Sequence, residues 1–283
     1  MFEQPHHEAI FARAELVDAV MGPTDLEGQC GFLEYVSRHL GRGRLESFLE
    51  VCCGPGYYVH CMAARGVRAY GVESVPEMAA FAREKARRLS REVPDGPAAG
   101  GPGEGAPAPA TIVEADLRNI VLPEAVDLAF CPGSKLRYLL RDEDVIEHFV
   151  SVATNLGRGG LYVLDLDHPA QLFDPSLRKP IRMEGKIGDV EVSIQWGTGH
   201  EKVDPVLQIV DLDVVMEIEK DGRKEIIRDS APVRVFTHKE IQLLVKLSGV
   251  FEWVATFGDL NIGAPFESAA PDSRMVPVLR CSV

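Results

Sequence analysis

Residues 48–56 read Phe-Leu-Glu-Val-Cys-Cys-Gly-Pro-Gly, a short apolar strand followed by a glycine-rich turn. Because glycine has no side chain, such a turn lets a ligand approach the backbone closely. In parallel α/β sheets, ligands bind at the carboxyl ends of the strands, which is where this turn lies. The stretch therefore predicts an α/β fold with a ligand site at the end of its first strand.

Acidic residues stand at the ends of three predicted strands. Glu50 lies just before the turn, Glu73 ends the predicted strand 68–73, and Asp116 follows the predicted strand 111–115. A carboxylate at Glu50 would repel a pyrophosphate, but it suits a ligand with a positive amino group and a positive sulfur. Glu73 could accept hydrogen bonds from both hydroxyls of a ribose, and Asp116 could accept one from an adenine amino group. Together they predict a site for an adenosine that carries an ammonium group.

Predicted strands and helices alternate from the turn to about residue 170, as in a mainly parallel, doubly wound sheet. The pattern predicts helices over 57–65, 76–91 and 142–156, the last ended by Gly157, and further strands over 126–131 and 161–166. Two helices, 8–21 and 25–40, precede the first strand, and two strands, 251–257 and 274–280, close the chain. The predicted fold class is α/β, with a Rossmann-like, doubly wound, seven-stranded sheet.

A different pattern begins near residue 181. Segments 182–197, 206–219 and 224–236 alternate apolar and polar residues, and Asp221-Gly222 is typical of a hairpin turn. They predict an antiparallel β insertion, which would act as a cap over an acceptor pocket or as a subunit interface, for example in a homodimer. Three candidates for lining that pocket are Trp196, His200 and Arg234. After the insertion, Thr237 and Glu240 form a capping-box pattern that opens a helix ended by Gly249.

These patterns divide the chain into four parts. We expect an N-terminal helical lid over 1–44, a Rossmann-like cofactor-binding core over 45–180, the insertion over 181–235, and a C-terminal completion of the sheet over 236–283. Within the core, residues 93–110 are rich in proline, glycine and alanine and have no large aliphatic side chain after Val93. Such a segment buries too little apolar surface to offset its ordering entropy, so we predict a flexible surface loop.

Composition narrows the classes of function. The chain of 283 residues has 43 acidic and 30 basic side chains, a formal charge of −13. Nucleic-acid binders usually carry the opposite balance, so we expect no nucleic-acid partner, and an anionic membrane is disfavoured for the same reason. The six cysteines include no CxxC pair and no zinc spacing, which predicts no metal site and buried, reduced thiols. Without an apolar signal segment at its start, the chain is expected to be cytoplasmic.

The motifs together resemble the class I S-adenosylmethionine-dependent methyltransferases, of the type that acts on small molecules. The matching stretches are Glu50–Gly56, Gly71–Met78, Ala115–Leu117, Leu156–Leu161, Phe236–Glu240, Ser248-Gly249 and Asp272–Met275. The resemblance covers about residues 45–170 and 235–283. Two departures are Cys52, where the family usually has its first glycine, and Arg158, where it usually has proline. Neither removes a group that the family uses to contact its ligand.

The resemblance implies S-adenosylmethionine as the cofactor. Glu50 would orient its amino end, the backbone of Gly54 and Gly56 would pack against its methionine part, Glu73 would hold the ribose, and Met78 and Leu117 would sandwich the adenine. The full cofactor-binding set that it implies is Glu50, Cys53, Gly54, Gly56, Glu73, Ser74, Met78, Asp116, Leu117 and Pro132.

Catalytic residues are harder to assign, because much of the rate of methyl transfer can come from orientation and exclusion of water. His168 follows the fifth core strand and is a candidate general base, since its ordinary pKa lies near neutrality. Tyr138 lies in the segment after the fourth strand, which borders the methyl-transfer site in related small-molecule methyltransferases. His6 and His7 would belong to the N-terminal lid or to a flexible terminus.

The interpretation that we favour is a methyltransferase that moves a methyl group to nitrogen or oxygen of a small-molecule acceptor by in-line displacement. Three alternatives stay open. A protein or RNA methyltransferase would use the same fold with a different partner. A cofactor-binding regulatory subunit without catalysis would keep the acidic and glycine positions. A nicotinamide-dependent oxidoreductase is disfavoured by Glu50 and by Val59, which stands where the third glycine of its fingerprint belongs.

Overall fold

The computed structural model of the chain describes residues 6–92, 108, 110–267 and 273–283. The loop predicted over 93–110 lies almost wholly outside these residues. In the described part of the chain, no helix is both long enough and apolar enough to cross a bilayer.

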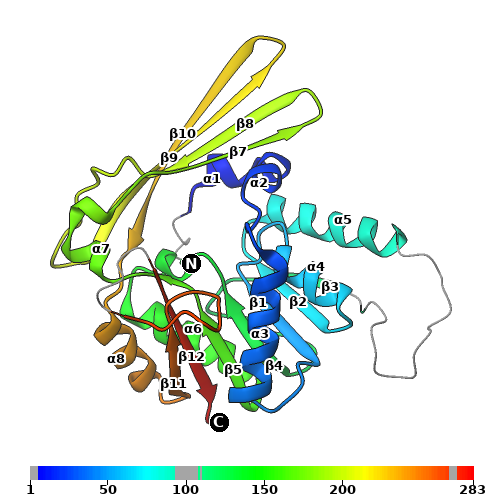
Figure 1. The fold of residues 1–283 in the computed structure, drawn as a ribbon, viewed down its shortest axis with the longest axis vertical. Helices are drawn as coiled ribbons and strands as arrows, with labels where there is room; N and C mark the ends of the chain where they lie inside the picture. Colours follow the sequence, from blue (N-terminus) through cyan, green and yellow to red (C-terminus); the bar gives the residue numbers. More distant parts are fainter. Residues whose placement is uncertain (1–5, 93–107, 109, 268–272) are drawn as a thin grey trace.

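A seven-stranded sheet forms the base of the molecule and confirms the predicted Rossmann-like fold (Figure 1). The order across it is β11 (Phe251–Phe257), β12 (Arg274–Cys281), β5 (Leu156–Leu164), β4 (Val126–Cys131), β1 (Ser47–Val51), β2 (Arg68–Glu73) and β3 (Ala110–Glu114). The strands β1 to β5 are mutually parallel, whereas β12 runs antiparallel to β5 and β11. The short β6 (Leu166–Asp167) pairs with β12 beyond the end of β5. The carboxyl ends of the parallel strands therefore meet along one edge.

Helices cover both faces of this sheet because successive strand residues point to opposite sides. The helices α3 (Leu26–Leu40), α4 (Tyr57–Ala64) and α5 (Pro76–Glu92) pack on the face that carries Phe48 and Phe130. The helices α6 (Asp142–Thr154) and α8 (His238–Ser248) pack on the face that carries Leu49 and Val51. The shorter helical segments are η1 (Lys135–Tyr138), α7 (Ala170–Phe173) and η2 (Pro175–Leu177). Thr237 and Glu240 form the predicted capping box of α8, and Gly249 ends that helix in the left-handed conformation.

One predicted helix end is wrong. The sequence placed it at Gly157, but α6 ends at Thr154 and Leu156 already pairs with Val126 as the first residue of β5. The side chain of Asn155 explains the earlier stop. Its amide donates to the carbonyls of Ile120 and Ser151 and accepts from the N–H of Leu122, so it ties the chain reversal to the neighbouring loop.

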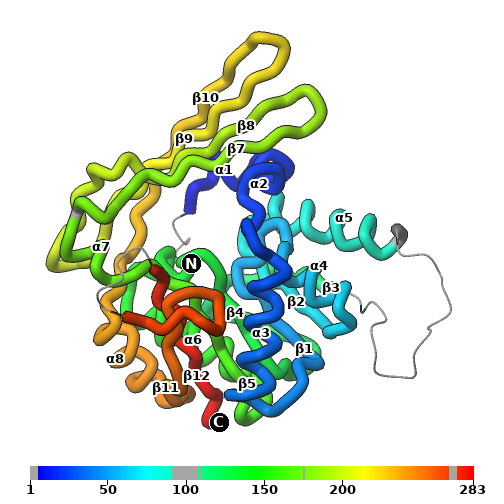
Figure 2. Tube along the Cα trace, viewed as in Figure 1, coloured from blue at the N-terminus to red at the C-terminus, as the bar shows by residue number. Residues whose placement is uncertain are grey.

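A second, four-stranded antiparallel sheet stands apart from the first (Figures 1 and 2). It contains β7 (Ile181–Ile187), β8 (Val190–Trp196), β9 (Ile209–Lys220) and β10 (Arg223–Arg234), paired in sequence order. The predicted turn at Asp221-Gly222 is present, and both residues have positive φ, at 51° and 71°. This is the pattern of a type I′ hairpin, whose twist matches that of its strands. The segment predicted as one strand over 182–197 is instead the hairpin β7–β8, which turns at Gly188, where φ is 57°.

The space between the two sheets holds the N-terminal helices (Figure 1). The predicted helix 8–21 is two helices, α1 (Glu8–Phe11) and α2 (Ala14–Val20). Their apolar side chains join those of the second sheet and of the start of α5 in one buried cluster, which includes Ile10, Val17, Met78, Ile194 and Met216. The second sheet is thus packed onto the core through α1 and α2.

Close contact between α2 and β7 depends on Gly185. A Cβ atom at this position would lie 2.1 Å from the carbonyl oxygen of Ala19 on α2. We predict that Gly185→Ala destabilises the fold by about 1–3 kcal/mol, because helix and strand must move apart. Gly31→Ala is the matched control, since a Cβ there meets no atom within 4 Å and alanine favours the helix. Thermal unfolding of both variants checks this, and equal melting temperatures would contradict the close-packing argument.

Candidate active site

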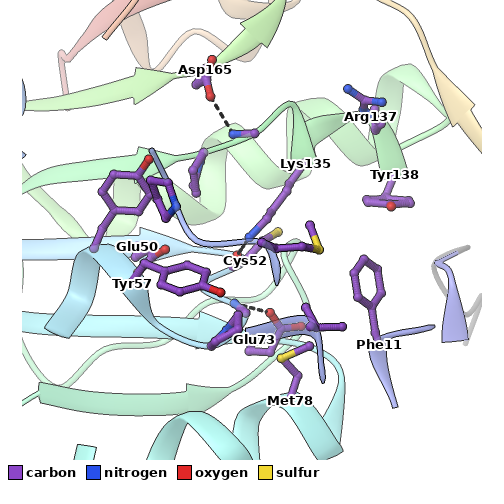
Figure 3. Close-up of a pocket in the computed structure, with 18 of the residues that line it drawn as sticks. Phe11, Glu50, Cys52, Tyr57, Glu73, Met78, Lys135, Arg137, Tyr138 and Asp165 are labelled. Atoms are coloured by element: carbon purple, nitrogen blue, oxygen red, sulfur yellow. Dashed lines mark hydrogen bonds between the residues drawn. The ribbon is translucent and has the colours of Figure 1, made fainter. Parts of the chain in front are cut away.

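A cavity of about 460 Å³ lies at the carboxyl ends of β1, β2, β4 and β5, and residues of α1, α2 and the second sheet also line it. Its two ends differ in chemistry. Glu50, Glu73 and Lys135 line the end formed by the strand termini, whereas Phe11, Tyr138 and Trp196 line the end that faces the second sheet. Figure 3 shows Phe11 and Tyr138 on one side of the cavity and Glu50 and Lys135 on the other.

The turn after β1 follows a left-handed path beside the cavity. Cys52, Gly54 and Gly56 have φ values of 53°, 54° and 83°. At Gly54 this leaves only backbone facing the cavity, as predicted. At Gly56 a Cβ atom would lie 2.8 Å from Nε2 of His60, so glycine is needed there for a second reason. Cys52 adopts the same region at an energetic cost and, unlike the other five cysteines, is not fully buried.

Cys53 and Gly56 support the turn and do not line the cavity. The N–H of Cys53 donates to the carbonyl of Val72 at 2.8 Å, and its fully buried side chain packs against Gly71 of β2. Gly56 lies at the start of α4. The structure therefore places these two predicted cofactor contacts behind the cavity wall, where they shape the turn.

Glu73 joins the turn after β1 to the start of α5. One of its carboxylate oxygens accepts the N–H of Gly54 at 2.8 Å, and the other accepts the N–H groups of Ser74 and Val75 at 2.9 and 3.0 Å (Figure 3). A carboxylate offers about four lone-pair positions, so one stays available to a ligand hydroxyl. The predicted ribose contact is therefore compatible with a second role in the backbone.

Glu50 is buried to 1% exposure, and its carboxylate accepts the N–H of Val59 at 2.8 Å. Burial raises the pKa of Glu50 to about 8, although the positive charge of Lys135 and the backbone donors oppose the shift. A carboxylate in this position lacks the hydration that would stabilise its charge. It is therefore suited to a ligand that brings a positive group.

Lys135 provides a positive charge at the same end of the cavity as Glu50. It was not among the predicted cofactor-binding residues. Its ammonium group donates to the carbonyl of Cys52, across the mouth of the turn (Figure 3). Burial opposes the charge on Lys135, but the neighbouring acidic groups, Glu50 and Glu73 among them, raise its pKa overall. The only signal in the sequence was its place in the segment after the fourth strand.

Most of the residues predicted to lie around the adenine are found in the wall of the cavity. Ser74, Met78, Leu117 and Pro132 all line the cavity. Asp116 does not, because its carboxylate accepts from the backbone and the guanidinium of Arg118. These contacts hold the pKa of Asp116 below its usual value. The structure therefore places Asp116 in an ion pair with Arg118 and outside the cavity.

His168 lies outside the cavity. It is buried to 2% exposure in the turn between β6 and α7, beside the ring of Phe266. Its Nδ1 accepts the N–H of Ala170, and its Nε2 faces the carbonyl oxygen of Glu267 at 3.2 Å. Both ring nitrogens thus have backbone partners, and this position gives the candidate general base no path to a ligand in the cavity.

Tyr138 does line the cavity, and its hydroxyl lies 3.0 Å from Nδ1 of His7. His7 is completely buried, contrary to the expectation of a flexible terminus. Of the candidates in the insertion, Trp196 lines the cavity, whereas His200 is exposed elsewhere. Arg234 forms ion pairs with Asp142 and Glu240 and joins the insertion to α6 and α8.

Comparison with solved structures gives chains with the same fold along nearly their whole length. An S-adenosylmethionine-dependent methyltransferase from Clostridium acetobutylicum has a TM-score of 0.70 at 13% identity, over 92% of this chain and 93% of that one. The CcbJ methyltransferase from Streptomyces caelestis has a TM-score of 0.65 at 20% identity, over 93% and 91%. An amino pentose methyltransferase from Micromonospora echinaspora has 0.65 at 14%, over 99% and 100%. No curated protein sequence matches significantly.

Residues 48–160 match the family model of a methyltransferase domain. This range runs from β1 into β5 and includes Glu50, Glu73, Lys135 and the glycine turn. The chain thus carries a match to a methyltransferase domain over these residues, and its fold is that of solved S-adenosylmethionine-dependent methyltransferases. One of the similar solved structures, the amino pentose methyltransferase, has S-adenosylmethionine bound.

A cluster of charges closes the cavity at the end of β5. The guanidinium of Arg274 on β12 donates to Asp165 at 2.7 Å, to Asp167 at 2.6 Å and to the hydroxyl of Ser134 at 2.9 Å. Arg137 binds the other oxygen of Asp167. Although burial opposes ionisation, Arg137 and Arg274 lower the pKa of Asp167 to about 2. The cluster therefore ties β12 and β6 to the segment that carries Lys135 and Tyr138.

We predict that Arg274→Met destabilises the protein by about 2 kcal/mol at pH 7, since two carboxylates lose their shared partner. The deficit should shrink as the pH falls toward 4, because Asp167 without Arg274 takes up its proton at a higher pH than in the wild type. Urea unfolding at pH 7, 5 and 4 measures it. The control is Arg158→Met, on a residue that belongs to neither the cavity nor this cluster. A deficit independent of pH would contradict the assignment.

Proposed function

We propose that this methyltransferase transfers the methyl group of S-adenosylmethionine to a nitrogen or oxygen atom of a small-molecule acceptor. The observation that carries the proposal is one cavity with a charged end at the strand termini and an aromatic end beneath the second sheet. A volume of about 460 Å³ lies within the range of roughly 300–1,000 Å³ in which pockets enclose small ligands.

The charged end fits the methionine part of the cofactor. That part carries an ammonium group and a carboxylate, and the cavity presents Glu50 and Lys135 side by side. Glu50 would hold the ammonium and Lys135 the carboxylate, while the bare backbone of Gly54 allows close approach. Glu73 would accept from the ribose, and Met78 and Leu117 would enclose the adenine. Bound there, the cofactor supplies an electrophilic methyl group.

The aromatic end fits the acceptor. Phe11 on α1 and Trp196 on β8 approach to a ring-centroid distance of 6.0 Å and form a wall with Tyr138. Within the described part of the chain, Nε1 of Trp196 is buried without a hydrogen-bond partner. It would serve as a donor to an acceptor molecule. These side chains exclude water and hold the acceptor atom in line with the methyl group, and such orientation can supply much of the rate.

We predict that Glu50→Gln weakens the binding of S-adenosylmethionine at least tenfold, which is about 1.4 kcal/mol, because a neutral amide loses the attraction to the ammonium group. Isothermal calorimetry with the cofactor and its demethylated product checks this. Glu252→Gln, on the exposed side of the edge strand β11, is the matched control. Unchanged affinity in Glu50→Gln would contradict the assigned role.

The same variant has an opposite effect on stability. The pKa of Glu50 is about 8 in the folded protein and near 4.3 in an unfolded chain, so its ionisation destabilises the fold increasingly as the pH rises from about 4 to 8. Without ligand, Glu50→Gln should therefore be more stable than the wild type at pH 8, by about 1 kcal/mol after allowance for the lost attraction to Lys135. A loss of both affinity and stability would point to misfolding.

The acceptor class is tested by turnover. We expect the demethylated cofactor to form with a member of a panel of amino sugars, small amines and phenols, and with neither unfolded protein nor RNA. Amino sugars come first because similar solved structures are described as sugar and amino pentose methyltransferases. Trp196→Phe should raise the KM for the acceptor about tenfold and leave cofactor affinity unchanged, whereas Trp253→Phe, on β11, should change neither. Turnover on RNA or protein alone would overturn the small-molecule proposal.

A further inference from the structure

The N-terminal segment places a histidine in direct contact with the cavity wall. His7 is 0% exposed and precedes α1. Its ring lies between two segments far away in the sequence, with Nδ1 at 3.0 Å from the hydroxyl of Tyr138 on η1 and Nε2 at 2.8 Å from the carbonyl oxygen of Leu212 on β9. The rings of Phe11 and Trp196 pack edge-on against it. A histidine so enclosed has a defined orientation.

The two contacts determine which ring nitrogen carries the proton. A carbonyl oxygen can only accept, so Nε2 of His7 must donate to Leu212. In a neutral imidazole the other nitrogen is then an acceptor, and the hydroxyl of Tyr138 donates to it. The proton of Tyr138 therefore points at His7, and the lone pairs of the phenol oxygen remain available on the cavity side.

We propose that Tyr138 and His7 form a proton-accepting pair for the methyl acceptor, with Tyr138 as the catalytic residue and His7 as the positioning residue that stores the proton. The inference rests on the proposed function, because it assigns the proton that an amine or hydroxyl acceptor must lose. His7 lies behind Tyr138 and acts only through it.

The transfer balances within the pair. A lone pair of the acceptor nitrogen or oxygen forms the new bond to the methyl carbon, and the carbon–sulfur bond breaks with its electrons left on sulfur. The acceptor's proton moves to the oxygen of Tyr138 as the hydroxyl proton of Tyr138 moves to Nδ1 of His7. The phenol ends as it began, His7 ends as an imidazolium, and release of one proton to solvent restores it.

The charges around the pair suit this use. Burial lowers the pKa of His7, the Leu212 carbonyl and Asp229 on β10 oppose the shift, and Arg137 on η1 and His6 add to it. His7 is therefore neutral at pH 7 and able to accept. Burial also raises the pKa of Tyr138, so the phenol is protonated before the reaction. It can take up the acceptor's proton only if it passes its own proton to His7 in the same step. Activity should fall as the pH drops through the pKa of His7, below 6.5.

The insertion completes the pair. Leu212 belongs to β9, and Asp229 on β10 accepts the N–H of Ala9 at 2.8 Å, which anchors the start of α1. These two contacts set the tautomer of His7 and, together with the apolar packing of α1, hold the segment that carries it. The same sheet that supplies Trp196 to the acceptor end thus also orients the proton acceptor.

The first test needs no acceptor. Nitrogen-15 NMR of the wild-type protein, with the His7 signal assigned from its loss in His7→Gln, should show the Nε2–H tautomer and a titration midpoint below 6.5. The midpoint should shift in Tyr138→Phe and stay unchanged in Tyr35→Phe, on α3. Two results would overturn the pair whatever the acceptor is: an Nδ1–H tautomer of His7, or a His7 titration midpoint of 6.5 that is the same in the wild type and in Tyr138→Phe.

The second test uses the panel member that gives turnover. Tyr138→Phe and His7→Gln should each lower kcat about a hundredfold, the double variant should be no slower than the slower single one, and cofactor affinity should stay unchanged. His7→Gln should also abolish the acidic fall in the pH profile, whereas His39→Gln, on the exposed end of α3, should keep it. Additive losses with an unchanged profile would overturn the pair and leave the proposed function standing. Cofactor binding without turnover on any panel member would instead count against the proposed function.

Discussion

The carboxylate of Glu73 is the contact on which the shape of the site depends. It binds three backbone N–H groups, from Gly54 in the turn after β1 and from Ser74 and Val75 at the start of α5. A turn that passes through positive φ at Cys52, Gly54 and Gly56 cannot pair its N–H groups as a regular strand does. An unpaired buried N–H costs free energy comparable to a lost hydrogen bond. Glu73 satisfies these groups and, in doing so, holds the ends of β1 and β2 open toward a ligand.

The strand ends also bring two oppositely charged side chains into a buried position. Glu50 and Lys135 face one another at the strand ends, and the raised pKa of Glu50 shows that their attraction does not fully compensate its burial. A buried ion pair seldom stabilises a fold in proportion to its Coulomb energy, because both ions lose their hydration. The pair is better explained as complementary to a ligand that carries both charges. The buried charges then destabilise the protein when no ligand is bound, and a ligand with the opposite charges relieves this destabilisation when it binds.

The sequence predicted what local chemistry decides. Patterns within short stretches predicted the alternating strands and helices of the core, the glycine turn, Glu50, Glu73, the Asp221-Gly222 hairpin and the capping box of α8. It did not predict His7, because the partners of His7 lie 131 and 205 residues away. Asp116 and His168 were predicted as site residues only because each follows the end of a strand. In the structure, Arg118 binds Asp116, and backbone groups contact both ring nitrogens of His168, so neither side chain lines the cavity. Asn155, and not Gly157, ends α6 for the same reason: its side chain bonds to a loop that periodicity does not reveal.

The residues proposed to bind the cofactor and those proposed to bind the acceptor come from different parts of the chain. Every residue proposed for the cofactor lies between Glu50 and Lys135, within the range that matches the family model. Apart from Tyr138, the residues proposed for the acceptor end come from the N-terminal segment and the insertion, which lie outside that range: Phe11, Trp196, and His7 with its partner Leu212. Tyr138 is the point at which the two sets meet, since it follows Lys135 by three residues and contacts His7. A change in the insertion can therefore alter which acceptor binds while the cofactor end stays intact. The same change also affects the proton acceptor, because the insertion sets the tautomer of His7.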